Sequence, residues 1–463
     1  MTNFYTLAKT AERLANREIS AVDLCENILA CVENLNPKIN AYSAILSETA
    51  RLEAAASDER RSRNCTLGPL DGIPIAIKDL IDTTPAICKA GLEHRSSYRP
   101  KRDAVVVKRL RRAGAVIIGV TETDPGAFST DTPQVTNPLA TNRSVGGSSG
   151  GSAAVIAAGL AFGAVGTDTG GSIRIPAACC SVYGFKPTWG RVDASGVMPL
   201  ASSLDHIGPL ARSIEDLQIL QLVLDPALDD CRDIALQTPI KLGVAVAYFE
   251  DADDDIKNAI ANVIKILGQS DIETRQVTLP APDSIMPFHM VTLPKEAADF
   301  HIRHYPEDWP LYPEIARRTV EMGRNITQQS YDQATVLRSK ACADVDAALE
   351  TVDALILPVM PIDAPRRNVS SYVLNGKSVS KLEATIRYTS LFNQTGHPVV
   401  AMPATTIADG RSISLQLVGK TDDDRLLLRL ARKLEEALSV QIRYKSIMEN
   451  QDVRPQKKAK GQL

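Results

Sequence analysis

Residues 144–192 decide the fold of this chain, and they read SVGGSSGGSAAVIAAGLAFGAVGTDTGGSIRIPAACCSVYGFKPTWGRV. Two serine sites bracketed by glycines lie in this stretch, GGSSGGS at residues 146–152 and TGGSIR at residues 169–174. Glycine on both sides of a serine permits a tight turn and keeps other side chains away from the hydroxyl. An approachable nucleophile, or a ring of donating backbone amides, requires this arrangement. The stretch therefore predicts a nucleophilic serine site.

Other interpretations of the glycine and serine pattern fit less well. GGSSGGS alone is typical of a flexible linker, but the segment from Ser152 to Gly166 is small, apolar and uncharged, which predicts a buried helix. Residues 146–150 match G-x-S-x-G, yet a nucleophile elbow follows an apolar strand, and TNRSV is not one. A Walker phosphate loop is excluded because the position five before Gly419 is Ser414, where that motif needs glycine.

The whole stretch resembles the core of the amidase signature family, serine hydrolases that cleave carboxamides. The resemblance continues through GFKPTWGRV and GVMPLASSLDHIGPLARSIEDL. In that family a serine nucleophile works with a second serine on a cis peptide bond and with a lysine. Carried over motif by motif, the resemblance implies Ser172 as the nucleophile and Ser148 as the bridging serine, 24 positions apart (172 minus 148). The lysine falls on Lys78, where the apolar run of GIPIAIKD predicts the end of a buried strand.

The mechanism implied by the resemblance is a proton relay. A lysine acts as a base only when neutral, so burial must lower the pKa of Lys78 by several units from about 10.4. Lys78 would take a proton from Ser148, which takes one from Ser172, and Ser172 would form an acyl-enzyme. Backbone amides would stabilise the oxyanion. The resemblance places these amides at Thr169, Gly170, Gly171 and Ser172.

Three further polar residues stand beside these sites. Asp168 and Arg174 flank the predicted oxyanion hole, and we expect them to hold it in place as an ion pair. Ser149 follows the bridging serine, and we expect its hydroxyl to hydrogen-bond within the relay. For all three, a purely structural role is an equal alternative.

Composition limits the class of partner. A net charge of -3 with 23% charged residues gives no electrostatic case for nucleic acid or an anionic membrane, which favours a small-molecule amide substrate. Without a signal peptide or a run of 18 apolar residues, we expect a cytoplasmic protein. The eight cysteines show no C-x-x-C spacing, so we expect reduced thiols, no metal and no cofactor. His301 and His304 have helical spacing without nearby ligands, which favours a polar surface pair.

Strands alternating with helices predict an α/β architecture. The resemblance implies one domain with a large mixed twisted β-sheet wrapped by α-helices. We assign residues 1–445 to this amidase domain, with its signature core at 144–192, and residues 446–463 to a polar basic C-terminal tail. Near the start, Ser20 with Asp23 predicts a helix cap, and Pro37 predicts the end of that helix. The oligomeric state stays open, and a homo-oligomer is compatible with the pattern.

The predicted function is that of a serine amidohydrolase, which cleaves a small or medium carboxamide to a carboxylate plus ammonia or an amine. We expect its acyl pocket to use residues 123–144 and the stretch from Met286 to Trp309. One alternative is the glutamine-hydrolysing component of a tRNA-dependent amidotransferase complex, but the T-N-M-D-E-F stretch of that component reads TETDPG here, at residues 121–126. A second alternative is a non-catalytic binding protein, which would be expected to have lost a member of the triad.

Overall fold

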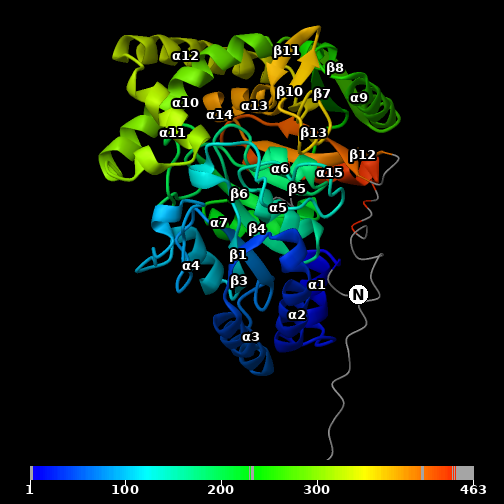
Figure 1. The fold of residues 1–463 in the computed structure, drawn as a ribbon. Helices are drawn as coiled ribbons and strands as arrows, with labels where there is room; N and C mark the ends of the chain where they lie inside the picture. The colour runs from blue at the N-terminus through cyan, green and yellow to red at the C-terminus, as the bar shows by residue number, and fades with distance from the viewer. Residues whose placement is uncertain are drawn as a thin grey trace, which may run out of the picture.

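An eleven-stranded mixed sheet runs through the part of the chain that the computed structural model describes, which is residues 4–228, 230, 234–407, 411–440, 442 and 444 (Figure 1). Its strands follow the order β1-β3-β2-β4-β6-β5-β12-β13-β9-β7-β8. Their bounds are β1 Tyr42–Ile45, β2 Pro74–Lys78, β3 Val116–Thr121, β4 Gly163–Asp168, β5 Tyr183–Lys186, β6 His206–Ala211, β7 Ile240–Ala245, β8 Ile272–Val277, β9 Ala354–Pro358, β12 Val399–Thr406 and β13 Ser412–Val418. A separate hairpin pairs β10 Ser371–Leu374 with β11 Lys377–Ser380.

Helices wrap this sheet, so the predicted α/β fold class is confirmed. Their bounds are α1 Leu7–Ala15, α2 Ala21–Ile39, α3 Ser47–Ser62, α4 Val105–Arg112, α5 Gly150–Ala157, α6 Arg174–Cys179, α7 Ile214–Leu224, α8 Val246–Glu250, α9 Asp254–Leu267, α10 Pro282–His304, α11 Glu314–Arg324, α12 Gln328–Leu349, α13 Lys381–Ile386, α14 Ser390–Thr395 and α15 Asp424–Leu438. The extent of the amidase domain stays a prediction, and the predicted tail at 446–463 lies outside the described residues.

Strand direction decides where the predicted site residues meet. β2 pairs in parallel with β4, with Ile77 opposite Val165. Because the carboxyl ends of parallel neighbours lie at one edge of a sheet, Lys78 at the end of β2 and Asp168 at the end of β4 come to the same edge. Every residue of both strands is buried, so polar groups at this edge are screened from water.

Helix α2 forms because its apolar positions recur every three or four residues and face the core, from Ala21 and Leu24 to Ile39. The predicted cap is present, since the Ser20 side chain accepts a hydrogen bond from the Asp23 amide. The predicted stop at Pro37 is wrong, because the helix continues to Ile39 and ends at Asn40 in the left-handed conformation. Near a helix end, a proline removes only one backbone hydrogen bond.

The apolar segment from Ser152 to Gly166 is only partly helical. Helix α5 ends at Ala157, Gly159 has a φ of +69° that breaks the helix, and the rest of the segment enters strand β4. An apolar run does not distinguish a buried helix from a buried strand by period alone. The prediction of one continuous helix is therefore wrong beyond Ala157.

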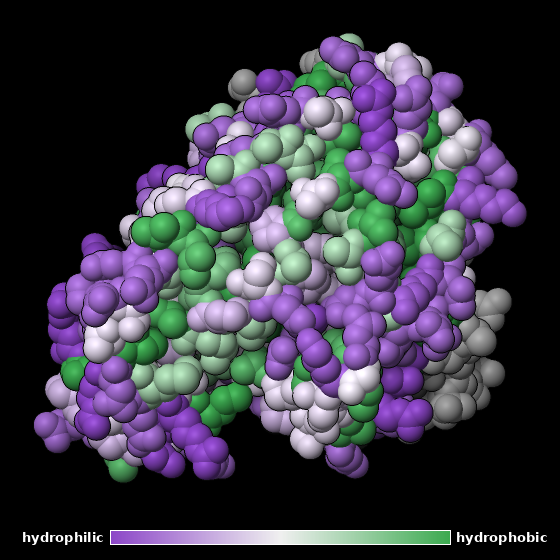
Figure 2. Space-filling view, turned by 90° about the horizontal axis from the view of Figure 1, so that it is seen from above, coloured by the Kyte–Doolittle hydropathy of each residue, from purple (hydrophilic) through white to green (hydrophobic). Residues whose placement is uncertain are grey.

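Helices α10, α11 and α12 form a layer that we call the cap, and Figure 1 shows them together at one end of the molecule. Hydrophilic and hydrophobic residues are interspersed on the face seen in Figure 2. Exposed apolar residues of the cap include Ile315, Val336 and Leu337. Among the described helices, none combines the length and the apolar character needed to cross a membrane.

Candidate active site

Lys78 is fully buried at the carboxyl end of β2. Its ammonium nitrogen donates to Ser148 Oγ at 2.6 Å and to Thr167 Oγ1 at 2.7 Å. Burial lowers the pKa of Lys78 from 10.5 to about 7, although the carboxylates of Asp124, Asp168 and Asp205 act to raise it. The lysine is therefore able to lose its proton near neutral pH while it contacts Ser148.

Ser148, the predicted bridging serine, lies in a loop that packs directly on the loop of Ser172. The Gly147–Ser148 peptide bond is cis, as the family resemblance implies. The Ser148 carbonyl accepts from Thr123 Oγ1 at 3.0 Å, and the following amide, of Ser149, donates to the Ser172 carbonyl at 3.2 Å. Between the hydroxyls of Ser148 and Ser172, both within the described residues, the structure shows no hydrogen bond. Lys78 and Ser148 are thus joined by a side-chain hydrogen bond, and the two serine loops are joined by a backbone hydrogen bond.

Ser172 belongs to residues 169–173, which we call the serine turn and which connect β4 to α6. Ser172 is buried, with 6% of the residue exposed. Gly171 has a φ of +129°, and a Cβ there would lie 2.3 Å from Thr389 Oγ1, so only glycine fits. The Gly171 carbonyl accepts from the Ile175 amide at 2.7 Å, which places Ser172 within the first turn of helical hydrogen bonds.

Asp168 and Arg174 form the expected ion pair, with both side chains fully buried and 2.9 Å between Oδ1 and Nη2. Asp168 also accepts from the amides of Gly171 at 2.8 Å and Ile173 at 3.0 Å, so the carboxylate holds both sides of Ser172. Burial alone would raise the pKa of Asp168, but the Arg174 guanidinium holds it well below its usual range. The pair therefore fixes the serine turn, while any part in the reaction itself stays a prediction.

Ser149 does not bond within the relay as predicted. Its hydroxyl instead donates to the Thr167 carbonyl at 3.1 Å and accepts from the Thr167 amide at 3.3 Å. Ser149 thus fixes the backbone of the residue whose own hydroxyl contacts Lys78. Thr167 was missed by the sequence analysis, since a threonine inside an apolar strand is an ordinary strand former.

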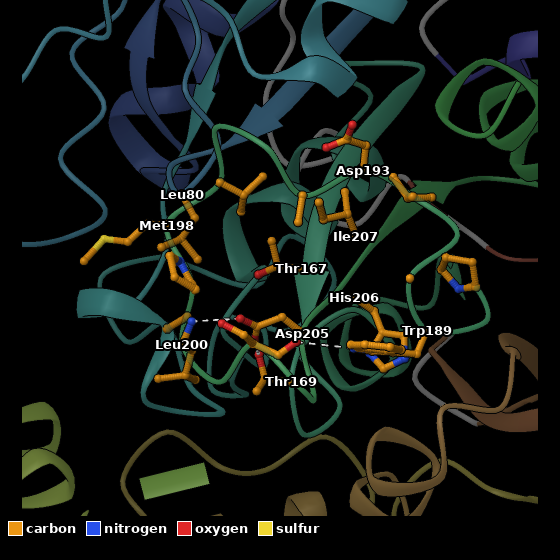
Figure 3. A pocket seen from close by; sticks show the side chains of 18 of the residues that line it. Leu80, Thr167, Thr169, Trp189, Asp193, Met198, Leu200, Asp205, His206 and Ile207 are labelled. Atoms are coloured by element: carbon orange, nitrogen blue, oxygen red, sulfur yellow. Dashed lines mark hydrogen bonds between the residues drawn. The ribbon is translucent and has the colours of Figure 1, made fainter. Parts of the chain in front are cut away.

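A cavity of about 350 Å³ opens beside the serine turn (Figure 3). Its wall is mostly apolar, with Leu80, Met198 and Ile207, and Trp189 at 48% exposure also lines it. Most of the lining comes from residues 187–207. Ala127 lines it from the predicted 123–144 stretch, while the stretch from Met286 to Trp309 does not reach this cavity.

Asp205 joins this cavity to the serine turn. It accepts from Thr169 Oγ1 at 2.6 Å and from the Leu200 amide at 2.9 Å, and Figure 3 shows these three residues grouped at one side of the cavity. Burial raises the pKa of Asp205 to about 6, against these hydrogen bonds. Asp205 ties the loop that forms the cavity wall to the residue that begins the serine turn.

The histidines of α10 do not form the predicted surface pair. His304 is exposed, but His301 is buried, and its Nδ1 lies 2.9 Å from the Tyr312 hydroxyl. The helix packs this face inward against α11, which spacing alone did not reveal. Within the described residues, the acidic, cysteine and histidine side chains form no group of three that could hold a metal ion.

The structure brings a buried lysine into contact with one of the two glycine-bracketed serines at the edge of a mixed α/β sheet, which is the contact that the predicted serine hydrolase site requires. Comparison with known proteins agrees, because the model of the Amidase family matches residues 23–428. The chain belongs to the amidase family, whose members hydrolyse carbon–nitrogen amide bonds. The predicted family and enzyme class are confirmed.

Several relatives match over nearly the full chain. An amidase of Pseudomonas putida is 34% identical, covering 96% of this chain and 98% of its own. A glutamyl-tRNA(Gln) amidotransferase chain from Chloroflexus aggregans is 33% identical, over 92% and 95%. A crystal structure of an amidase superposes with a TM-score of 0.86 at 31% identity, over 94% of this chain and 100% of that one.

Proposed function

We propose that this chain is a serine amidohydrolase that works alone and cleaves a small or medium carboxamide to a carboxylate plus ammonia or an amine. The observation that carries the proposal is the buried contact of 2.6 Å between Lys78 Nζ and Ser148 Oγ. A buried lysine with a pKa of about 7 is partly neutral at neutral pH and can therefore act as a general base. The expected cytoplasmic location stays a prediction.

The reaction begins with proton transfer along the relay. Neutral Lys78 takes the proton of Ser148, which takes the proton of Ser172 as Ser172 Oγ attacks the carbonyl carbon. The protonated relay then gives a proton to the leaving nitrogen as the carbon–nitrogen bond breaks, which leaves an acyl-enzyme. Water, activated by the same relay, attacks the acyl carbon, releases the carboxylate and returns the proton to Ser172.

The oxyanion in this reaction needs backbone donors on the serine turn. Of the four predicted amides, that of Gly171 already donates to Asp168 Oδ1. We therefore assign the main donors to Thr169, Gly170 and Ser172, with Gly171 fixing the turn through Asp168. Donors held in this way need no reorganisation as charge develops, which is the basis of oxyanion stabilisation.

The cavity supports a substrate of limited size. Its volume of about 350 Å³ is near the lower end for small-molecule sites. Apolar walls with a polar end at Thr169 and Asp205 suit an amide whose apolar part fills the cavity while its carbonyl reaches the serine turn.

The test is ammonia release by the protein purified alone, across aliphatic, aromatic and ureido amides with glutamine included. We expect turnover of at least one amide other than glutamine. Ser172→Ala should abolish this turnover, while Ser97→Ala, at an exposed serine, should retain it. Turnover of glutamine alone, and only with co-purifying proteins, would establish the amidotransferase alternative. A protein that hydrolyses no amide and has an unreactive Ser172 would be the non-catalytic alternative.

A further inference from the structure

His289 of the cap reaches the serine turn. Only 1% of this residue is exposed, and one edge of its ring faces Gly170. A Cβ atom on Gly170 would lie 3.2 Å from His289 Nε2 and 3.5 Å from Cε1. Contacts at 3.2 Å are tighter than ordinary van der Waals packing, so the ring approaches this closely because residue 170 has no side chain. The ring edge therefore stands beside the atoms proposed to bind the scissile carbonyl.

The opposite side of the ring determines which nitrogen carries the proton. The Gln394 side-chain amide donates from Nε2 to His289 Nδ1, with 3.1 Å between the two nitrogens. Burial lowers the pKa of His289 to about 4, so the ring is neutral and holds one proton at neutral pH. Because the accepting nitrogen carries no proton, that proton is on Nε2. His289 thus presents an uncharged N–H donor toward Gly170.

Two polar backbone groups of the serine turn at and beside Gly170 already have partners. The Gly170 carbonyl accepts from Thr389 Oγ1 at 2.5 Å, and the Gly171 amide donates to Asp168. Among the residues that the structure describes, none accepts a hydrogen bond from His289 Nε2. Unlike Nε2 of His206 and His301, Nε2 of His289 is not one of the partnerless side-chain atoms that are sealed from solvent, so a bound substrate can reach it and accept its hydrogen bond.

His289 and the cavity approach the turn at different residues. The cavity reaches the turn at Thr169, whereas His289 faces Gly170 together with Ile386, whose Cγ2 would lie 3.9 Å from a Cβ there. An amide bound with its carbonyl on the turn therefore has both the cavity and the His289 ring next to the atoms that adjoin its carbonyl.

We propose that His289 Nε2 donates a hydrogen bond to a neutral acceptor, an ether oxygen, a carbonyl oxygen or a ring nitrogen, that the substrate carries next to its scissile carbonyl. The inference rests on the proposed amidase function and adds a substrate class to it, amides with a second acceptor close to the reacting carbon. An uncharged acceptor suits this buried position, because a neutral donor does not offset the free-energy cost of burying a carboxylate.

Two amides of equal size test this inference, methoxyacetamide and butanamide, which differ by an ether oxygen in place of a methylene group. The wild-type protein should show a higher kcat/KM for methoxyacetamide by about fivefold, the usual effect of one neutral hydrogen bond. His289→Phe, which keeps a flat ring without the donor, should remove the preference by slowing methoxyacetamide alone. His289→Gln should restore part of it, and His304→Phe, at an exposed position of the same helix, should leave it unchanged.

Labelling of Ser172 by a fluorophosphonate, measured on each variant, separates this inference from the proposed function. If the wild-type protein labels but hydrolyses the two amides at equal rates, the inference about His289 is contradicted and the proposed function is not. The same holds if His289→Phe loses the same factor in rate on both amides. Should His289→Phe fail to label because the turn has collapsed, His289→Leu, which also lacks a donor, carries the same comparison. A wild-type protein that neither labels nor hydrolyses any amide would overturn the proposed function itself.

Discussion

The signature core and the cap meet at Gly170, and they accommodate charged side chains in different ways. In the core, Lys78, Asp168 and Arg174 are fully buried and held by hydrogen bonds. In the cap, ion pairs lie at the surface, as in Arg318 with Glu314, whose side chains are 71% and 67% exposed. Removing one partner leaves a buried charge in the core but a hydrated one in the cap. The same kind of substitution should therefore have very different effects in the two regions.

The largest effect is expected at the base of the relay. Lys78→Ala removes the group that accepts the proton, and general acid-base assistance is worth about 100- to 10,000-fold in rate. Turnover should fall by that factor in an ammonia-release assay. Lys340→Ala, on the exposed face of α12, is the matched control and should keep the wild-type rate. A Lys78→Ala enzyme near that rate would refute the relay.

A second comparison concerns stability. Arg174→Leu leaves the buried Asp168 carboxylate without its cation, which typically costs about 3–5 kcal/mol. Arg318→Ala breaks an exposed pair in the cap and should change the free energy of unfolding by less than about 1 kcal/mol. Urea unfolding of both variants measures the two values. If both variants lost the same free energy of unfolding, burial would not explain the difference between ion pairs in the core and in the cap.

The pH dependence of activity should reflect the pKa of Lys78. Because the neutral form is the base and its pKa is about 7, kcat/KM should rise with pH through that value to a plateau. Well below it, the rate should fall about tenfold per pH unit, since each unit lowers the neutral fraction by that factor. The measurement is a rate profile from pH 5 to 9. A profile that is flat between pH 6 and 8 would contradict this assignment.

The smallest effect is expected at Thr167. Thr167→Val removes one acceptor of Lys78 but keeps the shape of the side chain, and a lost hydrogen bond of this kind is worth about 1 kcal/mol, or about fivefold in rate. Because a charged lysine loses a partner, its pKa should fall and the rise of kcat/KM should move to lower pH. Thr335→Val, at an exposed threonine of α12, is the control. A shift to higher pH would mean that Thr167 does not accept from Lys78.

The parts of the site that sequence analysis predicted are those carried by local pattern. Glycines around Ser148 and Ser172, and an apolar strand before Lys78, mark turns and burial within a few residues. Thr167 and His289 had no such signal. One is an ordinary strand residue, and the other became relevant only when α10 packed its buried face on the serine turn.

The same distinction explains the errors in the fold. An apolar run predicted the buried strand before Lys78, whereas the run from Ser152 to Gly166 was predicted as a helix and did not show where α5 ends and β4 begins. The stretch from Met286 to Trp309 does not line the cavity beside the serine turn, because residues 187–207 form most of its wall through contacts such as that of Asp205 with Thr169. The same stretch does bring His289 against Gly170. Contacts between segments that are distant in the chain produce no periodic pattern in the amino-acid sequence.

The most direct measurement of the central claim is covalent labelling of the purified protein by a serine-directed fluorophosphonate, with the modified residue identified by peptide mass spectrometry. We predict one labelled peptide, modified at Ser172, with labelling lost in Ser172→Ala, strongly slowed in Lys78→Ala and unchanged in Ser97→Ala. Labelling that persists unchanged in Ser172→Ala, or that maps to another serine, would contradict the account.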